Sequence, residues 1–284
     1  MSSKITIVTA FFDIGRENWT TDKGYPDYLF RAPETYIDYF KNLATLDNEI
    51  IIFTSQNYAE RIKDIRKDKP THVIVIDYPN EFKVYKEKIN KIQQSESYRS
   101  KVSAKQLINP EYWSSDYALL TNLKSYFVSQ AIKKNLTSND LVAWIDFGYC
   151  RDMETLNGVV EWKYDFDHKK VHIFSLKKLP WLTLNKVKNS IYNNKVFIIG
   201  GITIAERSKW IEFQKLIYRC QIELLKNGIV DDDQGVYLFA FYKKSNIFKN
   251  HILGKNRWRT LFETYDVTAN LSFKQKFKKL LNIL

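Results

Sequence analysis

Cysteine, glycine and proline are scarce in this chain of 284 residues. Cys150 and Cys220 are its two cysteines, and their separation matches no metal-binding spacing. This usage predicts buried free thiols in a reducing compartment, and it argues against a disulfide-stapled scaffold or a cysteine zinc site. The 9 glycines and 6 prolines are too few to indicate long disordered linkers.

Long apolar runs are also missing from the sequence. No run of 18 apolar residues occurs, so we expect no transmembrane helix. The amino terminus enters a strand pattern at once and carries no signal peptide, which predicts a cytoplasmic protein.

Acidic residues are outnumbered by basic ones. The 44 Lys and Arg residues against 32 Asp and Glu residues give a net charge of +12. Such a surplus fits nucleic acid, an anionic membrane surface or phosphorylated small substrates. The basic residues are spread along the chain and form no recognised nucleic-acid motif, so nucleic acid is the least expected of these partners.

Buried strand patterns alternate with helical patterns over most of the chain. This alternation predicts one α/β domain, with a mostly parallel, Rossmann-like central sheet flanked by helices. Residues 162–184 alternate charged and aromatic side chains, which indicates a hairpin or an insertion. The expected strands cover residues 5–12, 49–54, 72–77, 141–149 and 195–204, and the expected helices cover residues 33–43, 56–69, 82–105 in part, 115–134 and 206–227.

The chain is organised around the apolar stretch 141–150, which breaks at Asp146. An aspartate at the carboxyl end of a buried strand lies where open α/β sheets bind ligands. A carboxylate there suits Mn²⁺ or Mg²⁺ holding a diphosphate. The alternative is an aspartate that caps the turn after the strand.

Three other stretches carry unusual residues for their predicted positions. Gly200 and Gly201 interrupt a strand pattern, which marks a bulge or a close approach of the backbone to another group. Three successive acids, residues 231–233, precede Gln234 and a helix, and capping accounts for one of them. The loop after the first strand contains Arg16, and it is either a nucleotide-binding loop or plain surface.

The order of these motifs resembles the GT-A glycosyltransferases, in particular the glycogenin-like group. Members carry an aspartate motif after a strand, a glycine strand under the sugar, an Asp-Gln pair and a His-x-x-Gly-x-x-Lys element. The matching residues here are Asp146, Gly200–Gly201, Asp233–Gln234 and His251 to Arg257, with arginine in the last position. One departure is that Asp146-Phe-Gly148 stands where the family has Asp-x-Asp, so only one carboxylate remains.

The sequence as a whole resembles a second group, the bacterial HtrL/YibB family. The resemblance runs from the first strand to about Phe262 and rests on residues 8–19, 36–40 and 144–149. It implies an enzyme of surface-polysaccharide synthesis, transferring a hexose from a UDP-sugar to a lipopolysaccharide, O-antigen or capsule glycan, or to a lipid-linked glycan. Galactose, including its furanose form, is the implied sugar.

The two resemblances together assign roles to individual residues. Asp233 first and Asp232 second are expected to be catalytic, and Asp146 with His251 to hold a divalent metal ion. The residues expected at the donor are Thr9, Ala10, Phe11, Arg16, Lys124, Asp146, Gly200, Gly201, Gln234, Lys255 and Arg257. The alternatives are a non-catalytic envelope-assembly protein with a GT-A shell, or a basic nucleic-acid-binding protein.

The predicted domain covers residues 1–262, and a basic amphipathic tail covers residues 263–284. Apolar residues follow helical spacing in the tail, with lysines around them. This pattern predicts peripheral binding to the inner face of the inner membrane, the alternative being a helix docked on the core of the domain.

Overall fold

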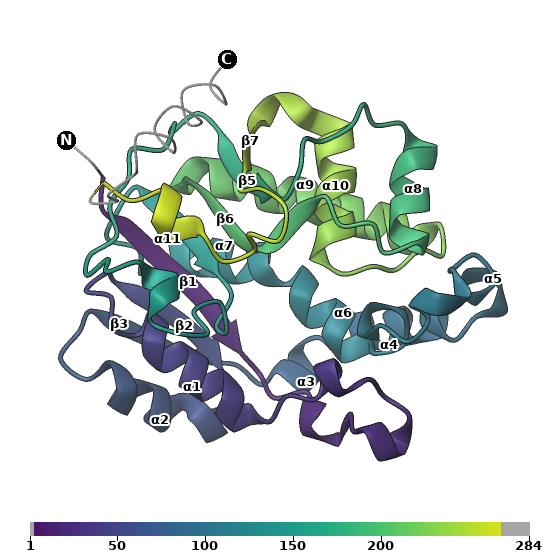
Figure 1. Ribbon diagram of the computed structural model, residues 1–284, viewed down its shortest axis with the longest axis horizontal. Coiled ribbons are helices and arrows are strands. Elements are labelled where there is room, and N and C mark those ends of the chain that lie inside the picture. The colour runs from purple at the N-terminus through teal and green to yellow at the C-terminus, as the bar shows by residue number, and fades with distance from the viewer. Residues whose placement is uncertain (1–2, 268–284) are drawn as a thin grey trace.

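The computed structural model describes residues 3–267 and is built on a seven-stranded sheet (Figure 1). The strands lie in the order β3-β2-β1-β4-β6-β5-β7, and β6 alone runs antiparallel to the others in this sheet. This arrangement confirms the predicted α/β class with a mostly parallel sheet. The strands are β1 Ile5–Phe11, β2 Ile50–Thr54, β3 Thr71–Val75, β4 Leu141–Ile145, β5 Val171–Ser175, β6 Ile198–Glu206 and β7 Phe248–Ile252.

Successive side chains of the central strands pack into two separate cores, one on each face of the sheet. On β4, Ala143 belongs to the core under α1 and α2, whereas Trp144 belongs to the core under α7, α9 and α10. This alternation follows from the two-residue period of a strand, and both faces are buried because helices cover both. The helices are α1 Pro33–Leu43, α2 Gln56–Arg66, α3 Tyr78–Glu81, α4 Lys83–Gln93, α5 Glu96–Arg99, α6 Ser115–Asn122, α7 Lys124–Lys133, α8 Leu184–Tyr192, α9 Arg207–Lys226, α10 Asp233–Lys244 and α11 Leu261–Thr264.

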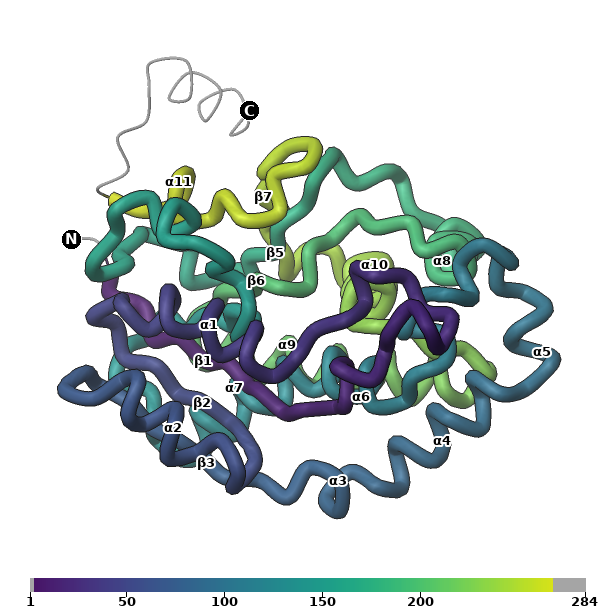
Figure 2. Tube along the Cα trace, turned by 60° about the horizontal axis from the view of Figure 1, so that its bottom comes forward, coloured from purple at the N-terminus to yellow at the C-terminus, as the bar shows by residue number. Residues whose placement is uncertain are grey.

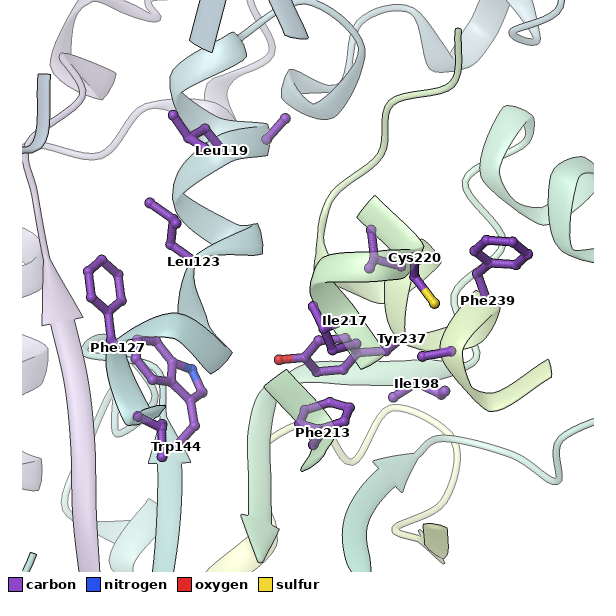
Figure 3. Packing of buried hydrophobic residues seen from close by; sticks show 14 of the residues in the cluster. Leu119, Leu123, Phe127, Trp144, Ile198, Phe213, Ile217, Cys220, Tyr237 and Phe239 are labelled. Carbon is purple, nitrogen blue, oxygen red and sulfur yellow. The ribbon is translucent and has the colours of Figure 1, made fainter. Parts of the chain in front are cut away.

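The core beneath α7, α9 and α10 is dense in aromatic side chains. Figure 3 shows Phe127 of α7 beside Trp144 of β4, and the two rings stack with their centroids 6.2 Å apart. Phe213 of α9 meets Tyr237 of α10 edge to face, with centroids 5.2 Å apart. These contacts fix α7 and α10, the two helices whose first residues reach the candidate site.

Two predicted elements differ from the structure. The helix expected over residues 115–134 divides at Leu123 into α6 and α7, so Lys124 begins a helix. The side-chain amide of Asn122 donates to the carbonyls of Ala118 and Asp231 at this junction, and so ties the end of α6 to the segment before α10. Residues 162–184 contain β5, which is buried between β6 and β7, and therefore are not a hairpin or an insertion.

Gly200 and Gly201 lie within β6, where the pairing with β5 shifts register. Ile199 pairs with Phe174, and Thr203 pairs with Ile173, so the residues between them bulge out of the ladder. The predicted bulge is therefore present.

The chain between β1 and α1 folds over the carboxyl edge of the sheet. Figure 2 shows this purple segment crossing toward the segment that precedes α6. The ring centroids of Trp19 and Trp113 lie 4.8 Å apart there, and the Tyr28 hydroxyl donates to the Asn109 side chain over 3.1 Å. The loop is thus held against the helical layer.

The amphipathic stretch predicted at the carboxyl terminus lies outside the described residues from position 268 onward. Before that point, Tyr265 packs into the core under α1. Within residues 3–267, none of the helices is both long enough and apolar enough to cross a membrane.

Candidate functional site

A cavity of about 320 Å³ lies at the carboxyl edge of the sheet, beside the ends of β1 and β4. Open α/β sheets bind their ligands at this edge. Eight predicted donor residues line the cavity, together with both predicted catalytic acids: Ala10, Phe11, Arg16, Lys124, Asp146, Gly200, Gly201, Gln234, Asp232 and Asp233.

Lys124 joins two acids of this cavity. Its Nζ lies 2.8 Å from Asp146 Oδ1 and 2.6 Å from Asp233 Oδ2, and it donates to the carbonyl of Gly200 over 3.0 Å. The side chain is 8% exposed. Burial alone would lower the pKa of Lys124, but the carboxylates of Asp146 and Asp233 outweigh it and hold the pKa above its ordinary value. Lys124 is therefore a buried, permanently charged ammonium that neutralises part of an acidic site.

Glycine is required at position 200 by the approach of Asp233. A Cβ atom at residue 200 would lie 1.8 Å from Asp233 Oδ2, which no side chain can accommodate. At Gly201 the corresponding distance is 3.2 Å, to Asp146 Oδ2. The bare backbone of the β6 bulge thus forms a wall against which both carboxylates rest.

The three successive acids have different structural roles. Asp232 is the N-cap of α10, and its Oδ1 accepts from the backbone N–H of Gln234 over 2.9 Å. Asp233 is the first residue of the helix and pairs with Lys124. Asp231 lies against the backbone of Gly235, where a Cβ atom would lie 1.8 Å from Asp231 Oδ2. The capping interpretation therefore accounts for Asp232, and the ion pair accounts for Asp233.

Burial sets the protonation of these acids. It raises the pKa of Asp233, and the charge of Lys124 acts in the opposite direction. Burial and the neighbouring charge of Asp233 raise the pKa of Asp232 well above its ordinary value. Because Lys124 contacts Asp233 directly and opposes the effect of burial there, the pKa of Asp233 is raised less than that of Asp232.

Asp146 follows β4, where its backbone forms the turn and its side chain lines the cavity. Its backbone N–H donates to the carbonyl of Gly201 over 3.0 Å and its carbonyl accepts from Tyr149 N–H, which forms the turn after β4. Its side chain accepts from the Trp144 indole over 2.7 Å and is 41% exposed at the cavity. The turn therefore rests on backbone hydrogen bonds that any residue could form, and the Asp146 carboxylate lines the cavity.

Two arginines of the cavity were not foreseen. Arg31 and Arg151 both line it, and neither forms an ion pair with a carboxylate among the described residues. The Arg151 guanidinium lies 5.5 Å from the centroid of the Tyr39 ring. Partial burial lowers the pKa of Arg151, and the positive charges of Arg259 and Arg31 lower it further. The cavity is thus lined by two guanidinium groups that no ion pair occupies among the described residues.

Arg16 is held more tightly than these two. Its guanidinium donates to the Tyr36 hydroxyl over 2.6 Å and to the Leu29 carbonyl over 2.9 Å, and it lies 5.1 Å from the Trp19 ring centroid. Arg16 therefore fixes the loop after β1 and at the same time contributes its charge to the cavity.

Four predicted site residues do not line this cavity. Thr9 is buried within β1. His251 lies on β7, separated from β4 by β6 and β5, and its Nε2 is 2.7 Å from Nδ1 of His172. In the loop after β7, Lys255 is exposed, and Arg257 lies 2.6 Å from Glu263. The structure thus does not bring His251 to Asp146. Within residues 3–267, no group of three or more His, Cys, Asp or Glu side chains is placed to share a metal ion.

Comparison with known proteins identifies relatives over the same residues. A family model described as "Bacterial protein of unknown function (HtrL_YibB)" matches residues 3–267. Protein HtrL of Escherichia coli (strain K12) is 44% identical over 266 residues, which is 93% of each chain.

The solved structures give a weaker likeness. One is 4-diphosphocytidyl-2C-methyl-D-erythritol synthase from Anaerococcus prevotii DSM 20548, which aligns with a TM-score of 0.36 and 12% identity over 99% of this chain and 97% of that one. A likeness at this level carries no conclusion about activity.

Proposed function

The chain belongs to the HtrL/YibB family of bacterial proteins, and we propose that it is a nucleotide-sugar-dependent glycosyltransferase. Its reaction would move a hexose from a UDP-sugar to a lipopolysaccharide, O-antigen or capsule glycan, free or lipid-linked. Galactose, as pyranose or furanose, is the first sugar to test, because the family resemblance implies it.

One observation carries this proposal. At the carboxyl edge of the sheet, Lys124 pairs with Asp146 and Asp233, which lie against the bare backbone of Gly201 and Gly200 respectively. A transferase that breaks a sugar–phosphate bond needs a cation near the departing oxygen and a carboxylate near the sugar carbon. The cavity supplies both groups within one contact network.

Two arginines, Arg31 and Arg151, are our candidates for binding the diphosphate of the donor. Charge builds on the leaving phosphate as the bond breaks, and preorganised cations stabilise it. Arg31 and Arg151 line the cavity without carboxylate partners among the described residues, so their guanidinium groups are available to phosphate oxygens. We assign the diphosphate to these two residues, in place of Lys255 and Arg257.

Asp146 is the residue that fits a divalent cation. Mg²⁺ and Mn²⁺ accept a site with one or two protein carboxylates, provided substrate phosphates and water complete the shell. Asp146 is the exposed carboxylate of the ion-paired group, whereas Asp233 is 2% exposed. A bound ion would supply Lewis-acid stabilisation of the leaving diphosphate.

Asp233 is our candidate for the sugar carbon. The charge of Lys124 opposes the rise that burial causes in its pKa, and a carboxylate there would either stabilise the positive charge at the anomeric carbon or take the proton of the acceptor hydroxyl. Asp232 is second, because its side chain is occupied as the cap of α10.

A panel of UDP-sugars tests the proposal. Hydrolysis of each donor is measured with and without Mn²⁺, for the parent chain, for Asp233→Asn, and for Asp64→Asn on α2 as a control far from the cavity. We expect turnover of one donor class, at least a hundredfold loss in Asp233→Asn, and parental rates in the control. UDP binding without turnover of any donor would favour the envelope-assembly alternative, and no UDP binding at millimolar ligand would reject the donor site.

A further inference from the structure

The stretch that contains β5, α8 and most of β6 has an unusual charge. From His168 to Ala205 the sequence contains no Asp or Glu residue, yet it contains seven lysines. These lysines lie at positions 169, 170, 177, 178, 186, 188 and 195. A surplus of this kind, within 38 residues, marks a surface suited to an anionic partner.

A tryptophan stands out from this basic segment. Trp181, in the loop between β5 and α8, is 85% exposed, more than any other large hydrophobic residue of the described chain. Its neighbours Leu179 and Leu182 pack against the core, and the Lys186 ammonium donates to the Trp181 carbonyl over 3.1 Å. The loop is therefore anchored to the core by Leu179 and Leu182, whereas the Trp181 indole is exposed to solvent.

The lysines around Trp181 lack acidic partners. Lys177, Lys178 and Lys186 are exposed, Lys188 is half-buried, and none of the four pairs with a carboxylate among residues 3–267. Elsewhere the lysines of α9 and α10, such as Lys209 and Lys244, pair with Glu212. The positive charge of these four lysines is thus not neutralised by any acid of the described residues, and it can attract an anionic partner.

We propose that Trp181, Lys177, Lys178, Lys186 and Lys188 form a surface that docks on an anionic lipid bilayer. We refer to these five residues as the Trp181 surface. Tryptophan favours the boundary between lipid and water, because its ring is apolar and its N–H is polar. Lysines are drawn to anionic headgroups while their stems cover apolar surface. A nucleic acid would use the charge but leave in water Leu184, which is 37% exposed and follows Trp181 by three residues.

The topology places this surface at the same edge of the sheet as the candidate site. Because β5 runs parallel to β4, both strands end at the same edge of the sheet, one leading to Trp181 and the other to Asp146. Figure 1 shows α8, which follows Trp181, at the margin of the molecule opposite α1 and α2. Docking would bring the cavity edge to the membrane. This inference does not depend on the transfer reaction.

Sedimentation with vesicles tests the Trp181 surface in the full-length chain. The vesicles are pure phosphatidylcholine, or phosphatidylcholine with phosphatidylglycerol. We expect binding to the anionic vesicles only. Trp181→Ala should lower the partition coefficient about tenfold, and Lys177→Glu with Lys178→Glu more than tenfold, since each lysine near an anionic surface is worth roughly fivefold.

Matched variants control for charge and for tryptophan. Lys88→Glu with Lys91→Glu on α4 has the same charge change, and Trp258→Ala removes another exposed indole; both should stay within about twofold of the parent. The altered side chains are exposed, so UDP binding and the melting temperature should not change, which separates this test from the donor site.

Quenching by brominated lipid gives a second readout. The chain has seven tryptophans, and we expect the quenching on anionic vesicles to disappear in Trp181→Phe, whose binding is kept by the phenyl ring. Parental sedimentation of both Trp181→Ala and the double lysine variant would overturn the proposal. The proposal would also be overturned if these variants lost binding to RNA while their binding to vesicles stayed unchanged. That result would assign the surface to nucleic acid.

Discussion

Lys124 determines how the charges of the cavity are balanced. One ammonium contacts two carboxylates and one carbonyl, so its removal leaves Asp233 buried without a cation. Breaking a buried pair in this way typically costs about 3 kcal/mol, because the remaining charge is uncompensated. The residue is therefore structural and electrostatic at once.

The first prediction concerns Lys124→Met. We expect a loss of about 3 kcal/mol in the free energy of unfolding at pH 7. Burial already raises the pKa of Asp233, and removing the ammonium raises it further. A carboxyl with a raised folded pKa stabilises the fold below its unfolded pKa and loses that contribution as pH rises. Urea unfolding should therefore show a smaller deficit at pH 4.5 than at pH 7, and an equal deficit at both values would contradict the ion-pair account.

Gly200→Ala is the second prediction. The new Cβ would lie 1.8 Å from Asp233 Oδ2, so Asp233 must leave its place beside Lys124. We expect loss of UDP-sugar turnover and a fall of several degrees in melting temperature. Gly201→Ala is the matched control, since its 3.2 Å contact requires a shift of only tenths of an ångström. Equal effects of the two changes would show that the approach of Asp233 is not the cause.

Glu111 provides the third prediction. It is 4% exposed, and burial raises its pKa to about 7. The folded state therefore binds its proton more tightly than the unfolded state, which stabilises the fold at low pH and less so as pH rises through 7. The contribution at stake is at most about 3 kcal/mol. Glu111→Gln should flatten the fall in unfolding free energy between pH 5 and pH 8, and an unchanged slope would assign that fall to other groups.

At the scale of elements, the buried strands were predictable because burial on both faces leaves continuous apolar runs. The apolar runs in the sequence predicted β1, β2 and β4, and the two adjacent glycines predicted the bulge of β6. The strand β5 was missed because its five residues include His172, which hydrogen bonding to His251 and to the Asp167 carbonyl makes tolerable in the core. This contact depends on His251 of β7, 79 residues away in the sequence, and no local pattern indicates it.

The site shows the same division between local and distant information. Asp146 and Asp233 could be predicted as candidates, because Asp146 breaks a long apolar run and the acids of residues 231–233 outnumber what capping requires. Arg31 and Arg151 could not, since an arginine in a loop is ordinary until the fold brings two of them to one cavity. His251 had the spacing of a known motif, but β5 and β6 lie between its strand and Asp146. Motif order therefore indicated acids that line the cavity, without fixing which cations face them.

For the whole molecule, the proposed donor site makes stability depend on ligand. A ligand that binds the folded chain alone raises the melting temperature by mass action. Two independent cation sources are assigned to the diphosphate, a metal ion at Asp146 and the arginines Arg31 and Arg151. The thermal shift should therefore divide into a part that needs metal and a part that does not.

The last prediction measures these two parts. With UDP and Mn²⁺ the parent chain should show the largest upward shift, and with UDP and a chelator a smaller one. Asp146→Asn should retain only the chelator-resistant part, because the amide is a weaker ligand for a hard cation. Arg151→Gln should lose that part and keep a response to Mn²⁺, since a neutral amide cannot replace the guanidinium at phosphate oxygens. Lys63→Gln on α2, outside the cavity, serves as the control and should match the parent in both conditions.

A shift that disappears completely in Asp146→Asn would mean that the arginines do not hold the diphosphate. A full shift in Arg151→Gln with chelator present would move the phosphates elsewhere in the cavity, with Arg16 the next residue to change.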